Sequence, residues 1–214
     1  MHIAHKSKER IRNHGEVFTH DREVNAMLDL VKRETERIDS RFLEPACGTG
    51  NFLIEILRRK LQIVRKRYKN NQFDYEKYAI IAVSSVYGVD LLKDNIEECI
   101  SRLYELFDNE YTSIYKTKCK NSCRKSVRFI LSRNIIQGDA LTLKTPDEKS
   151  PIVFSEWNIA KDNLIKRRDY TLANLLENAL PEQGTIFASL GEKAFIPRPV
   201  ADYPLVHFLK LGAV

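Results

Sequence analysis

The segment 44–52 reads Glu-Pro-Ala-Cys-Gly-Thr-Gly-Asn-Phe, and it constrains the fold of this chain more than any other stretch. Apolar residues before it predict a strand over 41–46, and apolar residues after Asn51 recur at helical spacing. A strand that turns through glycines into a helix is typical of a ligand-binding loop. Glycine lets the backbone approach a ligand closely, and the start of the helix offers free N–H groups.

Two common nucleotide loops do not fit this segment. No Gly-Lys-Ser/Thr follows the glycines, so the sequence does not indicate a phosphate-binding P-loop. The dinucleotide pattern Gly-x-Gly-x-x-Gly is also incomplete, because Leu53 occupies the position of the third glycine.

Two acidic residues follow later predicted strands. Asp90 ends the β-branched segment 86–90, and Asp139 ends the segment 134–139. The carboxyl ends of parallel strands share one edge of a sheet, so Asp90 can accept hydrogen bonds from ribose hydroxyls and Asp139 from an adenine amino group. Alternatively, Asp90 caps the next helix and Asp139 lies in a surface turn. Together with the glycine loop, the two acids predict a nucleoside cofactor.

Strands and helices alternate along the chain, which predicts an α/β fold with parallel βαβ units in an open sheet. A fourth strand is expected at 151–154, and the remaining chain is too short for a complete seven-stranded sheet, so we expect a four- or five-stranded sheet truncated after the fourth strand. We expect a loop at 115–125 and a hairpin formed by 185–187 and 193–196. Predicted helices cover 21–36 (with Asp21 as N-cap), 51–64, 75–84, 91–107 and 170–179.

Three segments organise the chain in this interpretation. Residues 1–40 form a basic N-terminal segment with a helix that covers the cofactor site, and residues 41–157 form the cofactor-binding core. Residues 158–214 contain a C-terminal helix and an irregular or hairpin segment.

The net charge of +6 is concentrated in the clusters 58–69, 116–133 and 161–168. Such clusters fit a polyanionic partner, with solvated helix faces as the alternative. No apolar run approaches the roughly 18 residues of a membrane helix, and the polar start lacks the apolar core of a secretion signal, so we expect a cytoplasmic protein. Cys119 and Cys123 lack a second ligand pair, so we expect reduced thiols and no metal site.

The glycine-loop segment resembles the cofactor motif Asp-Pro-Ala-Cys-Gly-Ser-Gly-x-Phe of the S-adenosylmethionine-dependent N6-adenine DNA methyltransferases, which include the modification subunits of restriction systems. Glu44 replaces the aspartate and Thr49 the serine. Upstream, the segment 15–20, Gly-Glu-Val-Phe-Thr-His, is similar to the family's Gly-x-Tyr/Phe-Thr-Pro motif, with His20 in place of proline. The resemblance covers about residues 14–157 and implies a Rossmann-like methyltransferase fold.

The resemblance also implies which residues hold S-adenosylmethionine. Phe18 and Thr19 would cover the methionine end of the cofactor, and Asp90 and Asp139 match the family's acids for the ribose and the adenine edge. The full set of expected cofactor-binding residues is Phe18, Thr19, Glu44, Pro45, Ala46, Cys47, Gly48, Gly50, Asn51, Phe52, Asp90, Leu91, Asp139 and Ala140.

The sequence departs from the family at the catalytic motif Asn/Asp-Pro-Pro-Tyr/Phe, because no Pro-Pro occurs in the chain. In its place, after the fourth strand, stand Ser155, Trp157 and Asn158. Ser155 or Asn158 would hydrogen-bond the target amine and Trp157 would stack on a flipped base. The alternative, which we favour, is that Trp157 closes the core. The run 166–170 next to it would touch DNA phosphates or begin a helix capped by Asp169.

Three hypotheses follow. The first is an adenine-specific DNA methyltransferase of a restriction-modification or phage-defence system. The second is a catalytically incomplete, cofactor-binding regulatory or partner subunit of such a system, and the third is methylation of RNA or protein. A truncated sheet would expose a strand edge, so a partner subunit or a homodimer is expected beside DNA, without a membrane contact.

Overall fold

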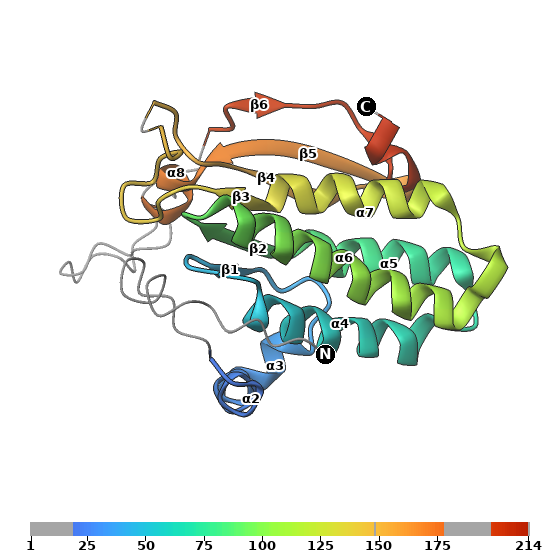
Figure 1. Cartoon of the computed structure of the whole chain (residues 1–214). Helices are drawn as coiled ribbons and strands as arrows, with labels where there is room; N and C mark the ends of the chain where they lie inside the picture. Colours follow the sequence, from blue (N-terminus) through green and yellow to red (C-terminus); the bar gives the residue numbers. More distant parts are fainter. Residues whose placement is uncertain (1–18, 148, 178–197, 214) are drawn as a thin grey trace, which may run out of the picture.

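The computed structural model of the chain describes residues 19–147, 149–177 and 198–213. A short parallel sheet lies beside four long helices, and an antiparallel sheet lies on the opposite side of it (Figure 1). The α/β class and the parallel arrangement of the first three strands are therefore confirmed.

The parallel sheet has the strand order β1-β2-β3, with β1 at Phe42–Glu44, β2 at Val86–Asp90 and β3 at Ile135–Gln137. Leu43 lies opposite Tyr87, and Val89 lies opposite Ile136. The bounds of β2 agree with the prediction, whereas β1 and β3 are shorter than the expected segments. All three strands end at the same edge, which is on the left in Figure 1.

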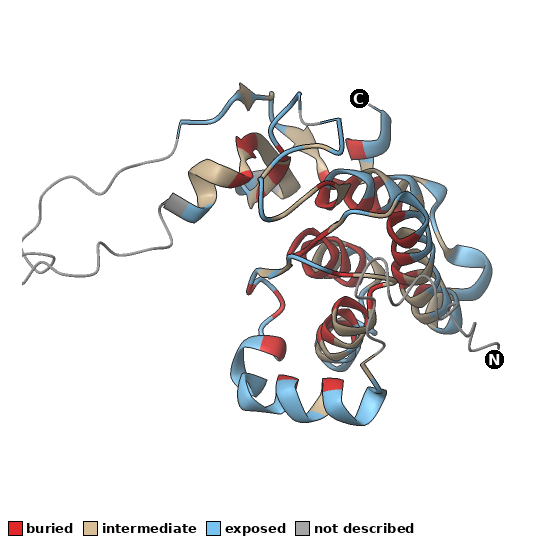
Figure 2. Ribbon diagram, turned by 60° about the vertical axis from the view of Figure 1, so that its left-hand side comes forward, coloured by how far each residue is buried: buried red, intermediate tan, exposed pale blue. Residues whose placement is uncertain are grey.

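Two pairs of helices connect these strands. The first pair is α4 (Asn51–Tyr68) with α5 (Gln72–Ser84), and the second is α6 (Lys93–Tyr115) with α7 (Asn121–Asn134). The helix α6 has 23 residues and β2 has 5, so the helices extend far beyond the sheet, to the right in Figure 1. Their inward faces are buried (Figure 2), so most of the core lies between helices.

The prediction of a loop over 115–125 is wrong. The 3-10 turn η1 (Lys116–Lys118) and two further residues separate α6 from α7, which begins at Asn121. Four buried residues of α7 recur at helical spacing: Cys123, Val127, Ile130 and Asn134. The basic residues between them lie on the outer face. The charge made the segment resemble a loop, although its apolar spacing supports a helix.

The strand β2 separates two cores, because its residues point alternately to opposite faces. Val86 packs with the helices, while Tyr87 and Val89 pack with Ile152 and Phe154 in a smaller cluster. Gly88 lies on the helical face, where an added Cβ would come within 2.9 Å of the Leu53 side chain. A side chain at this position would push α4 away from the sheet.

The fourth strand does not join the parallel sheet as expected. Instead β4 (Val153–Ile159) pairs antiparallel with β5 (Leu164–Thr171), which also pairs with β6 (Ala201–Asp202) and β7 (Val206–His207). A parallel strand needs a crossover connection, usually a helix. Residues 138–152 contain no helix among those the structure describes, so the expected four- or five-stranded parallel sheet is wrong. The β4–β5 hairpin also spans the segment boundary expected at residue 157.

Two further helix predictions need correction. The helix expected over 170–179 is α8 (Leu172–Glu177), and the basic run 166–170 before it belongs to β5 rather than to a helix start. The helix expected over 21–36 is split at Val31 into α2 (Asp21–Leu30) and α3 (Lys32–Thr35), and its N-cap is His20 rather than Asp21. The 3-10 turns η2 (Lys161–Asn163) and η3 (Phe208–Ala213) complete the fold. The predicted hairpin at 185–196 lies outside the described residues.

None of the helices in the part of the chain that the structure describes combines the length and apolar character that a bilayer crossing requires.

The buried lysine Lys60 connects α4 to the segment before β1. Its side chain is 0% exposed, and its Nζ donates to the carbonyl oxygens of Ile38 and Ser40 and to Ser85 Oγ. Burial lowers the pKa of this amine from its usual value of 10.5 to about 7, against the opposing effect of Asp39.

We therefore predict that stability rises with pH above pH 7. Between pH 7 and 10.5 the unfolded lysine binds more protons than the folded one, so the free energy of unfolding increases by at most about 1.4 kcal/mol per pH unit. Urea unfolding between pH 7 and 9.5 measures this slope, which Lys60→Met should remove and Lys66→Met, at an exposed position of the same helix, should keep. Equal slopes in all three proteins would show that Lys60 remains charged in the folded state.

Candidate cofactor site

The glycine loop between β1 and α4 depends on two glycines in left-handed backbone conformations. Gly48 has φ 52° and Gly50 has φ 90°, a region that favours glycine. An added Cβ on Gly50 would also lie 2.6 Å from Cys99 Sγ, so a larger residue there would have to displace the Cys99 side chain. The loop is closed by two hydrogen bonds of 2.8 Å, from Gly50 N–H to the Cys47 carbonyl and from Cys47 N–H to the Val89 carbonyl.

Asp90 holds this loop from the next strand. Its Oδ2 accepts the Gly48 N–H at 2.9 Å, and its Oδ1 accepts the Leu92 N–H at 2.9 Å and the Asn95 side-chain amide at 3.0 Å. The N-cap of α6 is Leu92, without a side-chain capping hydrogen bond, so Asp90 is not the N-cap that the sequence offered as an alternative, although it holds Leu92 and Asn95 at the start of this helix. A carboxylate can accept about four hydrogen bonds, so Oδ2 retains capacity for a further donor such as a ribose hydroxyl.

Asp139 lies at the same edge. The Gly138 N–H donates to the Asp90 carbonyl at 2.9 Å, which places the end of β3 beside the end of β2. Asp139 Oδ1 accepts the Leu141 N–H at 2.8 Å, as expected of a residue in a surface turn. The turn fixes one oxygen of this half-buried carboxylate at the edge where Asp90 ends.

The N-terminal segment reaches the loop through Thr19. The Asn51 side-chain amide donates to the Thr19 carbonyl at 3.2 Å, although the two residues are 32 positions apart. Thr19 therefore lies at the first turn of α4, beside the glycines. Phe18, predicted to pack near it, lies outside the described residues.

Arg102 of α6 clamps the other side of the loop, and the sequence did not indicate it. Its Nη1 donates to the Thr49 carbonyl at 2.7 Å, to Thr49 Oγ1 at 2.9 Å and to Asn51 Oδ1 at 3.0 Å. Asn95 was missed as well. It lies seven residues, or about two turns, before Arg102, so the two share a face of α6. The only sequence signal for these two residues was that they share one face of the helix that follows Asp90.

The predicted residues differ in how open they are to a ligand. Pro45, Ala46 and Leu91 are exposed, and Cys47 and Gly50 are buried. Burial raises the pKa of Glu44, partly offset by a hydrogen bond from the Ala46 backbone. The half-buried members of the set are Thr19, Glu44, Gly48, Asn51, Phe52, Asp90, Asp139 and Ala140.

The expected catalytic residues lie on β4. None of their side-chain hydrogen bonds among the described residues reaches the glycine loop. Ser155 is 2% exposed, and its Oγ donates to Asp169 Oδ1 at 2.7 Å. Trp157 is 7% exposed, and its Nε1 donates to Asn134 Oδ1 at 2.9 Å. The Trp157 ring belongs to the main core, which is the arrangement we favoured from the sequence.

Asn158 is the most accessible of the three. It is half-buried, and its Oδ1 accepts from Arg41 Nη2 at 3.3 Å. Arg41 also forms an ion pair of 2.8 Å with Glu156, so this residue before β1 is held against β4. Residues on opposite sides of a strand alternate, so Asn158 points away from the side of Ser155 and Trp157.

The four cysteines are free thiols, and Cys47, Cys99 and Cys123 are buried. Within the described residues, no three His, Cys, Asp or Glu side chains are grouped so that they would hold a metal ion.

Comparisons with protein-family models, with curated proteins and with solved structures gave no match to this chain. The assignment of the site therefore rests on its motifs and geometry.

We predict that the fluorescence of Trp157, the only tryptophan, does not respond to DNA. A buried indole with a hydrogen-bonded N–H has blue-shifted emission that a DNA duplex, with or without S-adenosylmethionine, leaves unchanged. Trp157→Phe should lower the free energy of unfolding by about 1–3 kcal/mol, because it leaves the buried Asn134 oxygen without its donor. Strong quenching on addition of DNA and cofactor together would instead support stacking of the ring on a flipped base.

Proposed function

We propose that this protein binds S-adenosylmethionine at the glycine loop and methylates N6 of adenine in DNA, as part of a restriction-modification or phage-defence system. The observation that carries this proposal is the hydrogen bond from Gly48 N–H to the Asp90 carboxylate, with Asp139 and Thr19 next to the same loop. This combination gathers the cofactor motif and the two acids of the resemblance at one sheet edge.

Each part of the site has a chemical task in this proposal. Asp90 Oδ2 would accept a ribose hydroxyl, the free Asp139 oxygen would accept the adenine amino group, and Glu44 would face the cationic methionine end of the cofactor. Arg102 keeps Thr49 and Asn51 in place, so that the backbone of the loop needs little rearrangement on binding. When bound, S-adenosylmethionine would supply an electrophilic methyl group. The chain has to orient the target amine and accept its hydrogen bond.

A second candidate function is favoured by the state of β4. Ser155 and Trp157 are buried and hydrogen-bonded to Asp169 and Asn134, and only Asn158 is accessible enough to contact a target amine. A chain of this kind would bind the cofactor as a regulatory or partner subunit and would leave base recognition to another chain.

The exposed apolar residues fit a partner subunit or a second copy of the chain. Met27 is 55% exposed and Leu30 86% exposed on α2, and β1 pairs with no second neighbour among the described strands. A sedimentation measurement that gives only monomers at all concentrations would argue against a homodimer.

We predict that the purified protein transfers a labelled methyl group to unmodified DNA and that Asp90→Asn weakens cofactor binding tenfold or more, which lowers this transfer when the cofactor is below saturation. Loss of one charged hydrogen bond is worth about 1.5–3 kcal/mol. Glu97→Gln is the matched control, because Glu97 is a solvent-exposed acid of the same helix region, with a side chain 66% exposed.

The outcomes separate the two candidates. Cofactor binding that depends on Asp90, without transfer by the parent protein, would favour the partner-subunit function. Unchanged cofactor binding by Asp90→Asn would contradict both.

A further inference from the structure

The cations of the third basic cluster, 161–168, are largely neutralised within the chain. Lys166 forms an ion pair of 2.5 Å and Arg168 one of 3.7 Å with Asp202, and Arg167 pairs with Asp169 at 2.7 Å. The Arg167 guanidinium also lies 4.0 Å from the centre of the Tyr203 ring. This cluster holds β4, β5 and β6 together and leaves little charge for a polyanion.

The basic residues of α4 differ in whether they form ion pairs. Arg58 and Arg59, in the first half of the helix, pair with Glu55, and Arg65 pairs with Glu110 at 3.1 Å. Lys66 and Lys69 follow. Both are exposed, and neither forms an ion pair with a described residue.

Hydrogen bonds bring this end of α4 against η1. The Tyr115 hydroxyl donates to the Lys69 carbonyl at 3.0 Å, and the Gln72 amide donates to the Lys118 carbonyl at 2.8 Å. The far end of α4 and η1 together carry five exposed basic residues, which we call the basic tip: Lys66, Arg67, Lys69, Lys116 and Lys118.

Most acids around the basic tip are already paired, and the exception is Asp74, whose carboxylate accepts the neutral Asn71 side-chain amide at 2.7 Å. Glu110 binds Arg65, Asp108 binds Arg124 at 2.6 Å, and the buried Glu76 binds Lys120 at 2.8 Å. The tip therefore has a positive excess that the described residues do not compensate.

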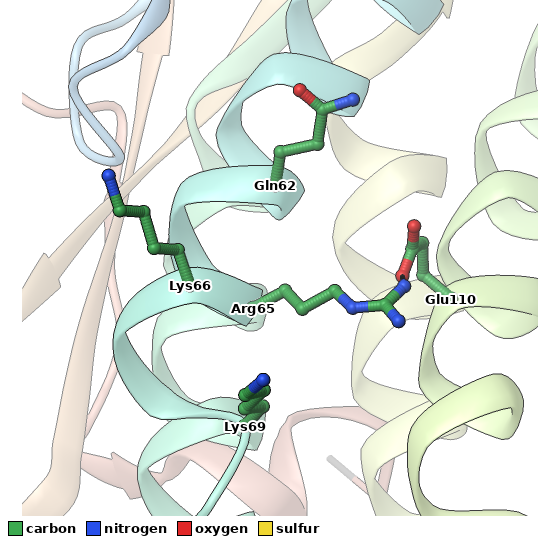
Figure 3. A pocket seen from close by; sticks show the side chains of 5 residues that line it. All are labelled: Gln62, Arg65, Lys66, Lys69 and Glu110. Carbon is green, nitrogen blue, oxygen red and sulfur yellow. Dashed lines mark hydrogen bonds and ion pairs between the residues drawn. The ribbon is translucent and has the colours of Figure 1, made fainter.

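An open hollow of about 370 Å³ lies between α4 and α6. Gln62, Arg65, Lys66, Lys69 and Glu110 line it, and Figure 3 shows Arg65 extended toward Glu110, with Lys66 and Lys69 on successive turns of α4. The hollow offers polar and cationic groups at its rim, as a phosphate or sugar requires.

The aromatic rings near the tip are already packed against other rings. Among the described residues, the nearest exposed large hydrophobic side chain is Phe73, which is 37% exposed at the start of α5, and its ring packs edge-on against Phe208. The Tyr68 ring stacks on Tyr78 at 4.0 Å, and the Tyr115 ring packs edge-on against Tyr75. Membrane surfaces favour apolar side chains beside the cations, and single-stranded nucleic acids favour free rings. A duplex phosphate backbone needs cations alone.

We propose that the basic tip binds the phosphate backbone of duplex DNA, at the end of the molecule opposite the glycine loop. The loop lies at the start of α4 and the tip at its end, about 25 Å away by helix rise (Figure 1). The tip is therefore an anchor that reads no base and is separate from the cofactor edge. The choice of DNA over duplex RNA rests on the proposed function, whereas the duplex backbone as ligand does not.

The test measures binding of a fluorescent DNA duplex across a range of salt concentrations. The triple variant Lys66→Gln/Lys69→Gln/Lys118→Gln should bind tenfold or more weaker at low salt and should reduce the slope of log K against log salt by about two to three. The control Lys32→Gln/Arg33→Gln/Arg37→Gln removes the same charge from exposed positions around α3 and should leave both quantities nearly unchanged. Thermal unfolding confirms that each variant is folded.

Equal loss of binding in both triple variants would overturn the proposal, since net charge alone would then explain it. Preference for a single strand of the same length, or for vesicles with anionic lipids, would also overturn it. Stronger binding to duplex RNA than to duplex DNA would overturn the choice of DNA. Titration of the tip variant with S-adenosylmethionine keeps the two proposals apart, because the tip can bind DNA in a protein that binds no cofactor.

Discussion

The contact between Gly48 and Asp90 joins the first two βα units of this protein. The Gly48 N–H and the Asp90 carboxylate meet at 2.9 Å, while the same carboxylate holds the start of α6 through Leu92 and Asn95. One side chain thus fixes the glycine loop, the end of β2 and the first turn of the next helix. Every other part of the candidate site is positioned relative to this junction.

The molecule differs on the two sides of the parallel sheet. On one side, long helices cover the sheet and continue beyond it, so the glycine loop and the basic tip lie at opposite ends of the same helix α4. On the other side, an antiparallel sheet packs on Tyr87, whose hydroxyl donates to the Ser155 carbonyl at 3.0 Å. This sheet contains β4 with the residues expected to be catalytic, of which Trp157 packs against α7 in the main core, and it is the part of the molecule that departs from an open parallel sheet.

The sequence was most informative where local chemistry determines structure. Glycines at 48 and 50 permit the left-handed backbone of a tight turn, so the turn and the start of α4 at Asn51 could be predicted, and the β-branched segment 86–90 indicated β2. The orientation of β4 could not be predicted, because four apolar residues do not specify a neighbour. Arg102 could not be predicted either, since its contacts to Thr49 and Asn51 join residues about fifty positions apart.

The most direct measurement is a calorimetric titration of the purified protein with S-adenosylmethionine. If the edge formed by the glycine loop, Asp90 and Asp139 is a cofactor site, the titration gives saturable binding of one molecule per chain, and S-adenosylhomocysteine competes for it. Absence of binding by a folded protein would contradict the assignment of this edge as a cofactor site.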